Sequence, residues 1–403
     1  MRDPLPEERV DGRKAALTIA MVVAGAAVLA LSRPRLAGTI GVLVAIIGMI
    51  MLHELGHFVM AKRAGMKVTE FFLGFGPRLW SFRRGETEYG VKAIPAGGYV
   101  RIIGMSNVEE IDPADEERTY RAKPYRHRLG VAVAGSAMHF ILASVLLFLV
   151  YAAAGLPSAR PVVDHIEPGY PAAASDFRIG DRIVAINGQP VKEWEDVPNY
   201  VQSHGESRLV FTMERNGGRL DIALTPRTEE IGGEQVPRVG IGPQTFFHRE
   251  PVHVAIGRTA GDMPRITWAT LRALGGIFSP SGMENYSNLL RGENADPNGR
   301  FLSPVGVARV AGNAVENGWG QVLFLLMAIN IFVGVFNMVP LLPLDGGHVA
   351  IATYEKIASM VTKRRVQVDV ARLMPITAAV LLVLVVLGIS ALYLDIVNPV
   401  EGP

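Results

Sequence analysis

Residues 37–61, AGTIGVLVAIIGMIMLHELGHFVMA, decide the fold of this 403-residue chain. They have the length and apolar character of a membrane-spanning helix, and within this segment no Asp, Glu, Lys or Arg precedes Glu54. His53 and His57 are four residues apart, so a helix places both on one face, where they can bind one metal ion. Glu54 lies beside them, where it can accept a proton from a water molecule. Ionisable residues at membrane depth are costly, so these three predict a zinc site within the membrane.

A short motif of this kind also arises by chance, and a histidine on an apolar helix face often only packs in a core. The position inside a membrane span favours the metal site, because three polar side chains at that depth need a reason. We therefore interpret His53 and His57 as ligands rather than as packed core residues.

The composition indicates a membrane protein with a soluble insert, because 49% of the residues are hydrophobic and the mean hydropathy is +0.25. The net charge of +2 gives no sign of a nucleic acid or another large acidic partner. The chain has no cysteine, which excludes disulfides and thiolate ligands. Zinc must then be bound by His, Asp, Glu or water.

Segments of membrane length predict about five spans in a lipid bilayer. They cover residues 15–32, 37–61, 129–154, 321–339 and 374–394. The first resembles a signal peptide, but we expect it to be retained, because the next helix follows after a very short loop.

The distribution of Lys and Arg predicts the orientation of these spans. Basic residues crowd residues 62–128 and 356–372, so both segments should be cytoplasmic. Residues 155–320 should then lie outside the cytoplasm. The protein is expected in the cell membrane, with the zinc motif toward the cytoplasmic side.

A second polar motif, NMVPLLPLDGGH at residues 337–348, interrupts an apolar span. Its prolines end a helix and its glycines permit tight turns, which membrane proteins tolerate where protein or water covers the backbone. A catalytic zinc takes three protein ligands and keeps one open position. Asp345 is the carboxylate of this motif, so His53, His57 and Asp345 are the predicted ligands.

Other side chains could provide the third ligand. Glu70, Glu86 and Glu88 follow the first motif at distances that a soluble zinc protease could use. They lie in a basic, glycine-containing segment that reads as strands and turns, so we rank them below Asp345. His348 is more consistent with a capping or supporting role than with ligation.

The two motifs together resemble the site-2 protease family of intramembrane zinc metalloproteases. Residues 73–80 and 86–100 resemble the bacterial branch that carries a PDZ domain and cuts membrane-bound anti-sigma factors. The resemblance implies zinc bound by His53, His57 and Asp345, with Glu54 as the general base. It also implies that Asn337 is a catalytic and substrate-binding residue that positions the substrate or the oxyanion. The implied partner is a single-span membrane protein, such as an anti-sigma factor.

Two features depart from the family pattern. The third span usually contains Gly-Pro-x-x-Asn, whereas this chain has Gly-Ser-Ala-Met-His at residues 135–139. We expect His139 to pack or to support the site rather than to bind zinc. The other departure is the extra span before the catalytic helix.

The segments 167–173 and 179–188 resemble a PDZ domain. Asn187-Gly188 is a strong hairpin signal, and Asp181 is expected to be structural. Asp176 stands where a glycine is usual, and aspartate can adopt the left-handed conformation that glycine serves.

The pattern of residues 68–103 predicts hairpins. These form either a small sheet that fills space in the helix bundle or an edge that pairs with an unwound substrate. Residues 263–278 read as an amphipathic helix, either on the membrane surface or packed in the soluble region.

The expected fold is a polytopic α-helical membrane protein of about five spans, with a membrane-associated β-hairpin region and an extracytoplasmic PDZ domain. Its predicted parts are a tail with an extra span (1–36), the catalytic span (37–62), a cytoplasmic β region (63–128), a further span (129–156), the PDZ domain (157–245), a linker with an amphipathic helix (246–319), and C-terminal spans with the second half of the site (320–403).

Two other functions fit parts of the sequence. A PDZ-bearing membrane scaffold or chaperone without catalysis would not need Glu54. A metal transporter would be expected to carry polar residues in several spans. The glutamate between two histidines favours hydrolysis over both.

Overall fold

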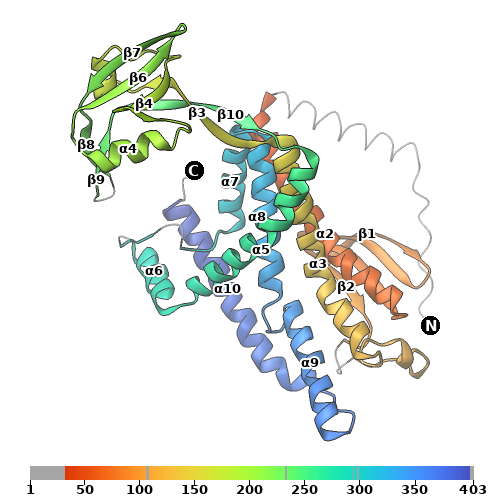
Figure 1. The fold of residues 1–403 in the computed structure, drawn as a ribbon. Helices are drawn as coiled ribbons and strands as arrows, with labels where there is room; N and C mark the ends of the chain where they lie inside the picture. The colour runs from red at the N-terminus through yellow and green to blue at the C-terminus, as the bar shows by residue number, and fades with distance from the viewer. Residues whose placement is uncertain (1–31, 106–108, 232–233, 294, 297–298, 400–403) are drawn as a thin grey trace. The chain divides into compact units, whose positions relative to one another are not determined.

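The computed structural model describes residues 32–105, 109–231, 234–293, 295–296 and 299–399 (Figure 1). The chain divides into two compact units. The helical unit comprises Met1–Val150 and Val252–Pro403, and the β unit comprises Tyr151–Pro251.

Four helices among the described residues are long and apolar enough to cross a membrane. They are α2 (Pro34–Arg63), α3 (Tyr125–Leu149) with a π-helical extension at Val150–Ala154, α8 (Trp319–Asn337) and α10 (Met374–Val397). These helices confirm the predicted helical segments that follow residue 36. The span predicted at residues 15–32 lies outside the described residues apart from Ser32, so the total of five remains a prediction.

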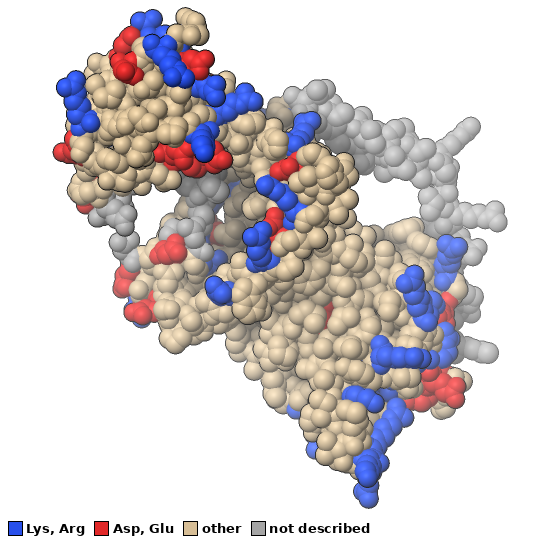
Figure 2. Space-filling model, in the orientation of Figure 1, with Lys and Arg blue, Asp and Glu red and all other residues tan. Residues whose placement is uncertain are grey.

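The surface of the helical unit suits a lipid environment. α10 exposes large apolar side chains, among them Leu382 at 63% and Ile389 at 64%. Figure 2 shows a broad surface of this unit without Lys or Arg, and basic side chains gathered near the end of α9 (Asp345–Thr362) and beside the β hairpin. Large exposed apolar surfaces are unusual in soluble proteins, whereas a membrane would cover them.

Glycines let the membrane helices pack closely. A Cβ atom at Gly56 on α2 would lie 2.6 Å from the carbonyl oxygen of Ala134 on α3. A Cβ atom at Gly334 on α8 would lie 3.2 Å from the Cβ atom of His139 on α3. Small residues allow such close backbone approach between membrane helices. α3 is thereby held against both α2 and α8.

A two-stranded antiparallel sheet follows α2, formed by β1 (Val68–Arg84) and β2 (Thr87–Ile102). Both strands are irregular, so that residues 70–73 pair with residues 98–101 and also with residues 88–91. The sequence predicted several hairpins, and the structure has one long, folded hairpin instead. Its surface exposes apolar side chains, including Leu79 at 69% and Ile94 at 54%.

The remaining helices of this unit are α5 (Val252–Ile277), α6 (Pro280–Arg291) and α7 (Pro304–Glu316). The amphipathic helix predicted to start at residue 263 exists, but its start is wrong. The helix begins at Val252, eleven residues earlier, and Pro264 lies inside it.

A buried ion pair ties the segment before α7 to the last turn of α10. Arg300 Nη2 lies 3.1 Å from Asp395 Oδ1, and both side chains are 1% exposed. The backbone N–H of Ser303 also donates to Asp395, at 2.6 Å. A charge at the end of a membrane helix is tolerated here because it is paired and hydrogen-bonded.

The β unit is built around a six-stranded sheet with the order β10-β3-β4-β6-β7, in which β5 pairs with β4. The strands are β3 (Leu156–Ile166), β4 (Arg182–Ile186), β5 (Gln189–Pro190), β6 (Leu209–Arg215), β7 (Gly218–Leu224) and β10 (Ile241–His248). A separate hairpin joins β8 (Arg227–Ile231) to β9 (Glu234–Arg238).

Side chains from the sheet and from α4 (Asp196–His204) form the core of the β unit. Ile183, Phe211 and Met213 are completely buried. Asn187 and Gly188 have φ angles of 50° and 80° between β4 and β5, as a two-residue hairpin turn requires. The hairpin predicted at Asn187-Gly188 is therefore confirmed.

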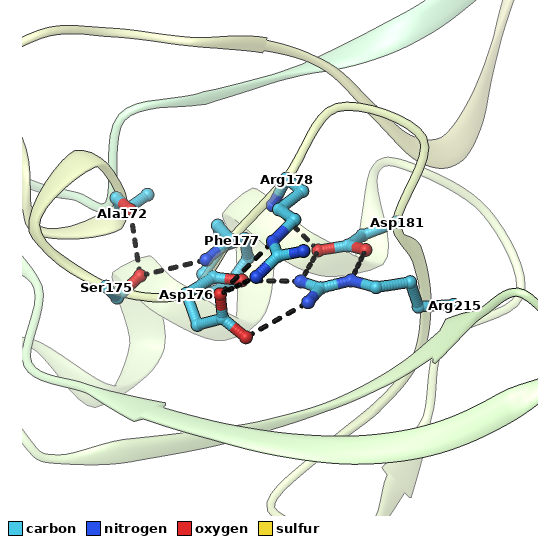
Figure 3. A network of polar contacts seen from close by, with 7 residues as sticks. All are labelled: Ala172, Ser175, Asp176, Phe177, Arg178, Asp181 and Arg215. Atoms are coloured by element: carbon cyan, nitrogen blue, oxygen red, sulfur yellow. Dashed lines mark hydrogen bonds and ion pairs between the residues drawn. The ribbon is translucent and has the colours of Figure 1, made fainter.

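Asp181 is at the centre of a polar network in this unit (Figure 3). Its carboxylate accepts from Arg215 Nε at 2.6 Å and from the backbone N–H of Arg178 at 2.8 Å. Burial alone would raise the pKa of Asp181, but these bonds hold it below the usual value. Asp176 bonds to Arg178 and Arg215 and is not among the residues with positive φ. Asp176 therefore does not use the left-handed conformation that aspartate tolerates, and its side chain forms ion pairs instead.

Candidate metal centre and active site

The structure brings His53, His57 and Asp345 together, although nearly 300 residues separate the two motifs. His53 and His57 lie one turn apart on α2, and Asp345 is the first residue of α9. The two Nε2 atoms are 3.1 Å apart. His53 Nε2 lies 3.4 Å from Asp345 Oδ2, and His57 Nε2 lies 3.3 Å from Oδ1.

These distances fit a zinc ion. Tetrahedral zinc with bonds of about 2.0–2.2 Å holds its ligand atoms roughly 3.3–3.6 Å apart. Each histidine nitrogen lies within this range of one Asp345 oxygen, and the two nitrogens are slightly closer to each other. One donor atom of each residue lies within 4.8 Å of the other two, and both histidines are buried. Two nitrogens and one carboxylate also match the donor set of catalytic zinc sites with an open position.

A backbone hydrogen bond orients His57. Its Nδ1 lies 2.7 Å from the carbonyl oxygen of Val131 on α3. A carbonyl can only accept, so Nδ1 carries the proton and the lone pair of the neutral ring is on Nε2. Nε2 faces the other two side chains, as a metal-binding histidine requires.

The turn before α9 fixes Asp345. A Cβ atom at Gly346 would lie 2.3 Å from the carbonyl oxygens of Met338 and Val339. A Cβ atom at Gly347 would lie 2.6 Å from the Leu342 nitrogen. Only glycine allows this turn to fold back so closely, and the turn aims Asp345 at α2.

A model of peptidase family M50 matches residues 41–384 of this chain. The chain belongs to peptidase family M50. It is similar to the zinc metalloprotease Rip1 of Mycobacterium tuberculosis, with 33% identity over 408 residues that cover 89% of this chain and 96% of Rip1. Rip1 of Mycolicibacterium smegmatis is 33% identical over 411 residues, with the same coverage. The predicted resemblance and the prediction of a zinc metalloendopeptidase are confirmed.

In this M50 peptidase, the Glu54 side chain lies against strand β2. A Cβ atom at Gly98 would lie 3.2 Å from Glu54 Cγ, so the strand passes in direct contact with this side chain. The backbone of Val100 hydrogen-bonds the Glu54 carboxylate. Glu54 is therefore held beside the donor atoms without being one of the three that face each other.

Asn337 is the last residue of α8 and is half-buried. No hydrogen bond of its side chain is present among the described residues, so the structure does not link it directly to His53, His57 or Asp345. Its predicted role with the substrate remains a proposal.

The three glutamates considered as alternative ligands form ion pairs and are not part of the donor group. Glu70, Glu86 and Glu88 each bond to basic side chains of the β region or of its neighbours. The partners are Arg101 for Glu70, Lys62 and Arg118 for Glu86, and Arg78 for Glu88. His348 is not part of the donor group, and its ring lies 6.3 Å from that of Tyr120.

α3 also contributes residues that lie near the metal centre. Ser136 Oγ donates to Asp345 Oδ2 at 3.4 Å, a long bond. His139 Nδ1 lies 2.9 Å from Asn330 Oδ1, and the His139 ring is 5.0 Å from the His53 ring. His139 is not among the three grouped donors, and its role in packing or in supporting the site stays a prediction. Asn330 could have been noticed as a lone amide in an apolar span.

Gly135 on α3 leaves the space that the metal centre needs. A Cβ atom there would lie 2.3 Å from His57 Nε2 and 2.4 Å from His53 Cε1. We predict that Gly135→Ala displaces both rings, so that zinc content and peptidase activity fall together to near background. Elemental analysis of the folded protein and a cleavage assay measure these two quantities.

Gly48→Ala on α2 is the matched control, because a Cβ atom at Gly48 meets nothing within 4 Å. This variant should keep zinc and activity. Wild-type zinc content and activity in Gly135→Ala would show that the rings are placed differently.

Proposed function

We propose that zinc is held by His53, His57 and Asp345 and that the enzyme hydrolyses a peptide bond within the membrane span of a single-span protein. The observation that carries this proposal is the spacing of the three donor groups, which two apolar helical segments bring to one point. Zinc, when bound, activates water and polarises a carbonyl. The test is cleavage of a single-span substrate reconstituted with the enzyme in lipid vesicles.

The proposed chemistry assigns proton transfer to Glu54. Its carboxylate lies next to the donor group and is oriented by the Val100 backbone, so it can accept a proton from water and pass it to the leaving amine. Asn337 is proposed to donate its amide hydrogens to the developing oxyanion. A neutral amide suits this task at low dielectric constant, because it adds no charge to desolvate.

The substrate must be extended before it is cut, because a helix hides its peptide bonds in its own hydrogen bonds. Residues 98–101 pair with residues 70–73 along one edge, and among the described residues no strand pairs with their other edge. Gly98 in this segment contacts Glu54. We propose that the free edge binds the unwound substrate by strand addition, which places a peptide bond beside the catalytic side chains.

The proposed substrate class is single-span membrane proteins such as anti-sigma factors, already trimmed outside by another protease. This follows from the resemblance of residues 53–57 and 337–347 to the site-2 proteases, and of residues 73–80 and 86–100 to their branch with a PDZ domain. The β unit is the proposed PDZ domain, supported by its sheet, its α4 helix and the turn at Asn187-Gly188.

We propose that the β region faces the cytoplasm and that the PDZ domain lies outside. Because the chain has no cysteine, single cysteines can test this directly. Ser203→Cys on α4 should react with an impermeant thiol reagent added to intact cells, and Glu117→Cys should react only after lysis. Both positions are exposed. The opposite labelling pattern would overturn the orientation.

The PDZ domain is proposed to screen substrates by size. Residues 161–243 can be excised and replaced by an Asn-Gly turn. Arg160 on β3 pairs with Gln244 on β10, so the turn would join two residues that already face each other, and four further β3–β10 pairs, ending at Leu156 and His248, would remain. We predict that the excised enzyme still cuts a model span and also cuts one with a bulky outside domain, which wild type rejects. No proposed catalytic residue lies in the excised part.

The assay compares one model span that bears either a short or a bulky outside domain. The same excision with Glu54→Gln controls for cleavage by any other protease. A folded excision variant that cuts neither substrate, or that still rejects the bulky one, would refute the screening role.

A further inference from the structure

A basic pocket lies where the start of α3, the middle of α9 and the segment before α10 meet. It is a cavity of about 350 Å³. Five of its lining side chains are basic and one is a carboxylate. The basic side chains are Arg121, Lys123, Arg128, Lys356 and Arg365, and the carboxylate is that of Glu355.

Only part of this positive charge is neutralised by the protein. Arg128 Nη1 lies 2.5 Å from Glu355 Oε2, and both side chains are largely buried. Arg121 pairs with Glu116 at 2.6 Å. The other three basic residues have no ion pair among the described residues, so the pocket keeps about three uncompensated charges. These residues are Lys123, Lys356 and Arg365.

The Arg128–Glu355 pair forms a rigid wall of the pocket. Glu355 also accepts the backbone N–H of Val368 at 2.7 Å, which fixes the segment before α10 against α9. On the other side of the pocket, Arg365 donates to the carbonyl oxygen of Arg121 at 3.1 Å and so joins the segment after α9 to the segment before α3. The cavity is therefore framed by hydrogen bonds between three separate parts of the chain.

The pocket lies at the ends of two candidate membrane spans, Tyr125–Ala154 and Val370–Val397. Figure 2 shows basic side chains gathered near the end of α9. On α9, Met360 lies one turn after Lys356 and is 57% exposed, and Ile357 next to Lys356 is 52% exposed. Uncompensated cations beside an exposed apolar surface, at the end of a span, match the boundary between headgroups and acyl chains.

We propose that this pocket binds the phosphodiester headgroup of an anionic phospholipid. Lys123, Lys356 and Arg365 would neutralise the phosphate, and the exposed apolar side chains of α9 would contact the acyl chains. The apolar surface favours a lipid over free phosphate, which would gain nothing from it. The proposal is independent of the catalytic assignment, although the bound lipid would rest against the helix that starts at Asp345.

The test measures lipid binding to the full chain by native mass spectrometry in detergent, with phosphatidylglycerol as the probe and phosphatidylcholine as the neutral lipid. Wild type should bind one phosphatidylglycerol in preference to phosphatidylcholine. Each basic residue near an anionic lipid strengthens binding about fivefold, so Lys123→Gln, Lys356→Gln and Arg365→Gln together should weaken it about a hundredfold. Inorganic phosphate alone should not displace the lipid at equal concentration.

The matched control carries Arg63→Gln, Arg83→Gln and Arg84→Gln, which remove the same charge from exposed positions outside the pocket. It should keep the wild-type affinity. Equal weakening of phosphatidylglycerol binding in both triple variants would overturn the proposal. So would displacement of bound phosphatidylglycerol by inorganic phosphate, or by an acidic peptide more strongly than by added phosphatidylglycerol. If the triple variant does not fold, Lys356→Gln and Arg365→Gln can be measured singly, each with about a fivefold loss expected.

Discussion

Glu54→Gln should abolish cleavage of a reconstituted single-span substrate while zinc remains bound. General acid–base catalysis typically contributes 10²–10⁴-fold, so the rate should fall by about a thousandfold or more. Glutamine has nearly the same shape and its carbonyl oxygen can still accept from Val100, so the site should remain folded. Cleavage in vesicles and zinc content of the purified protein measure the two effects separately.

Glu88→Gln is the control, because Glu88 is a carboxylate of the neighbouring β region that bonds to Ser81 and Arg78. It should cut at nearly the wild-type rate. Wild-type cleavage by Glu54→Gln would rule out the base assignment. Loss of zinc from the folded Glu54→Gln protein would mean that this carboxylate is a ligand.

Asp345→Asn should weaken zinc binding itself, and not only slow the hydrolysis of the peptide bond. Removing even an indirect supporting partner of a metal ligand typically costs 10–100-fold in affinity, so a lost ligand should cost at least about a hundredfold. A neutral amide is a poorer ligand than a carboxylate, although it has the same size. Zinc affinity, measured by competition with a chelator of known affinity, checks this.

Asp369→Asn is a matched control, because Asp369 is exposed and only caps the short helix before α10. It should bind zinc as wild type does. If Asp345→Asn kept wild-type affinity, another group would have to be the third ligand, and Glu70 would be the first to examine.

The site could be predicted well because its signals are local. The spacing of His53 and His57 fixes one face of one helix, and the polar motif at residues 337–348 breaks an apolar span. The membrane helices followed from the length of their apolar runs. Asp345 could be proposed as the third ligand because it is the carboxylate of the second polar motif, and the family resemblance then implied the same set.

The features that were missed depend on packing between helices. Gly135 matters only because α3 crosses α2 at the histidines, and Val131 matters only because its carbonyl meets His57. The folding of β1 onto two parts of β2 depends on local irregularities that alternation alone does not reveal. The start of α5 was predicted eleven residues too late, and Pro264 lies inside this helix, a position that proline rarely takes.

The central claim is that one zinc ion joins α2 to α9. Anomalous diffraction from crystals of the zinc-loaded enzyme, recorded on both sides of the zinc absorption edge, tests it most directly. We predict a single peak bonded to Nε2 of His53, Nε2 of His57 and a carboxylate oxygen of Asp345, at about 2.0–2.2 Å. A peak at any other place, or a zinc bound to both histidines with Asp345 out of bonding distance, would contradict the account.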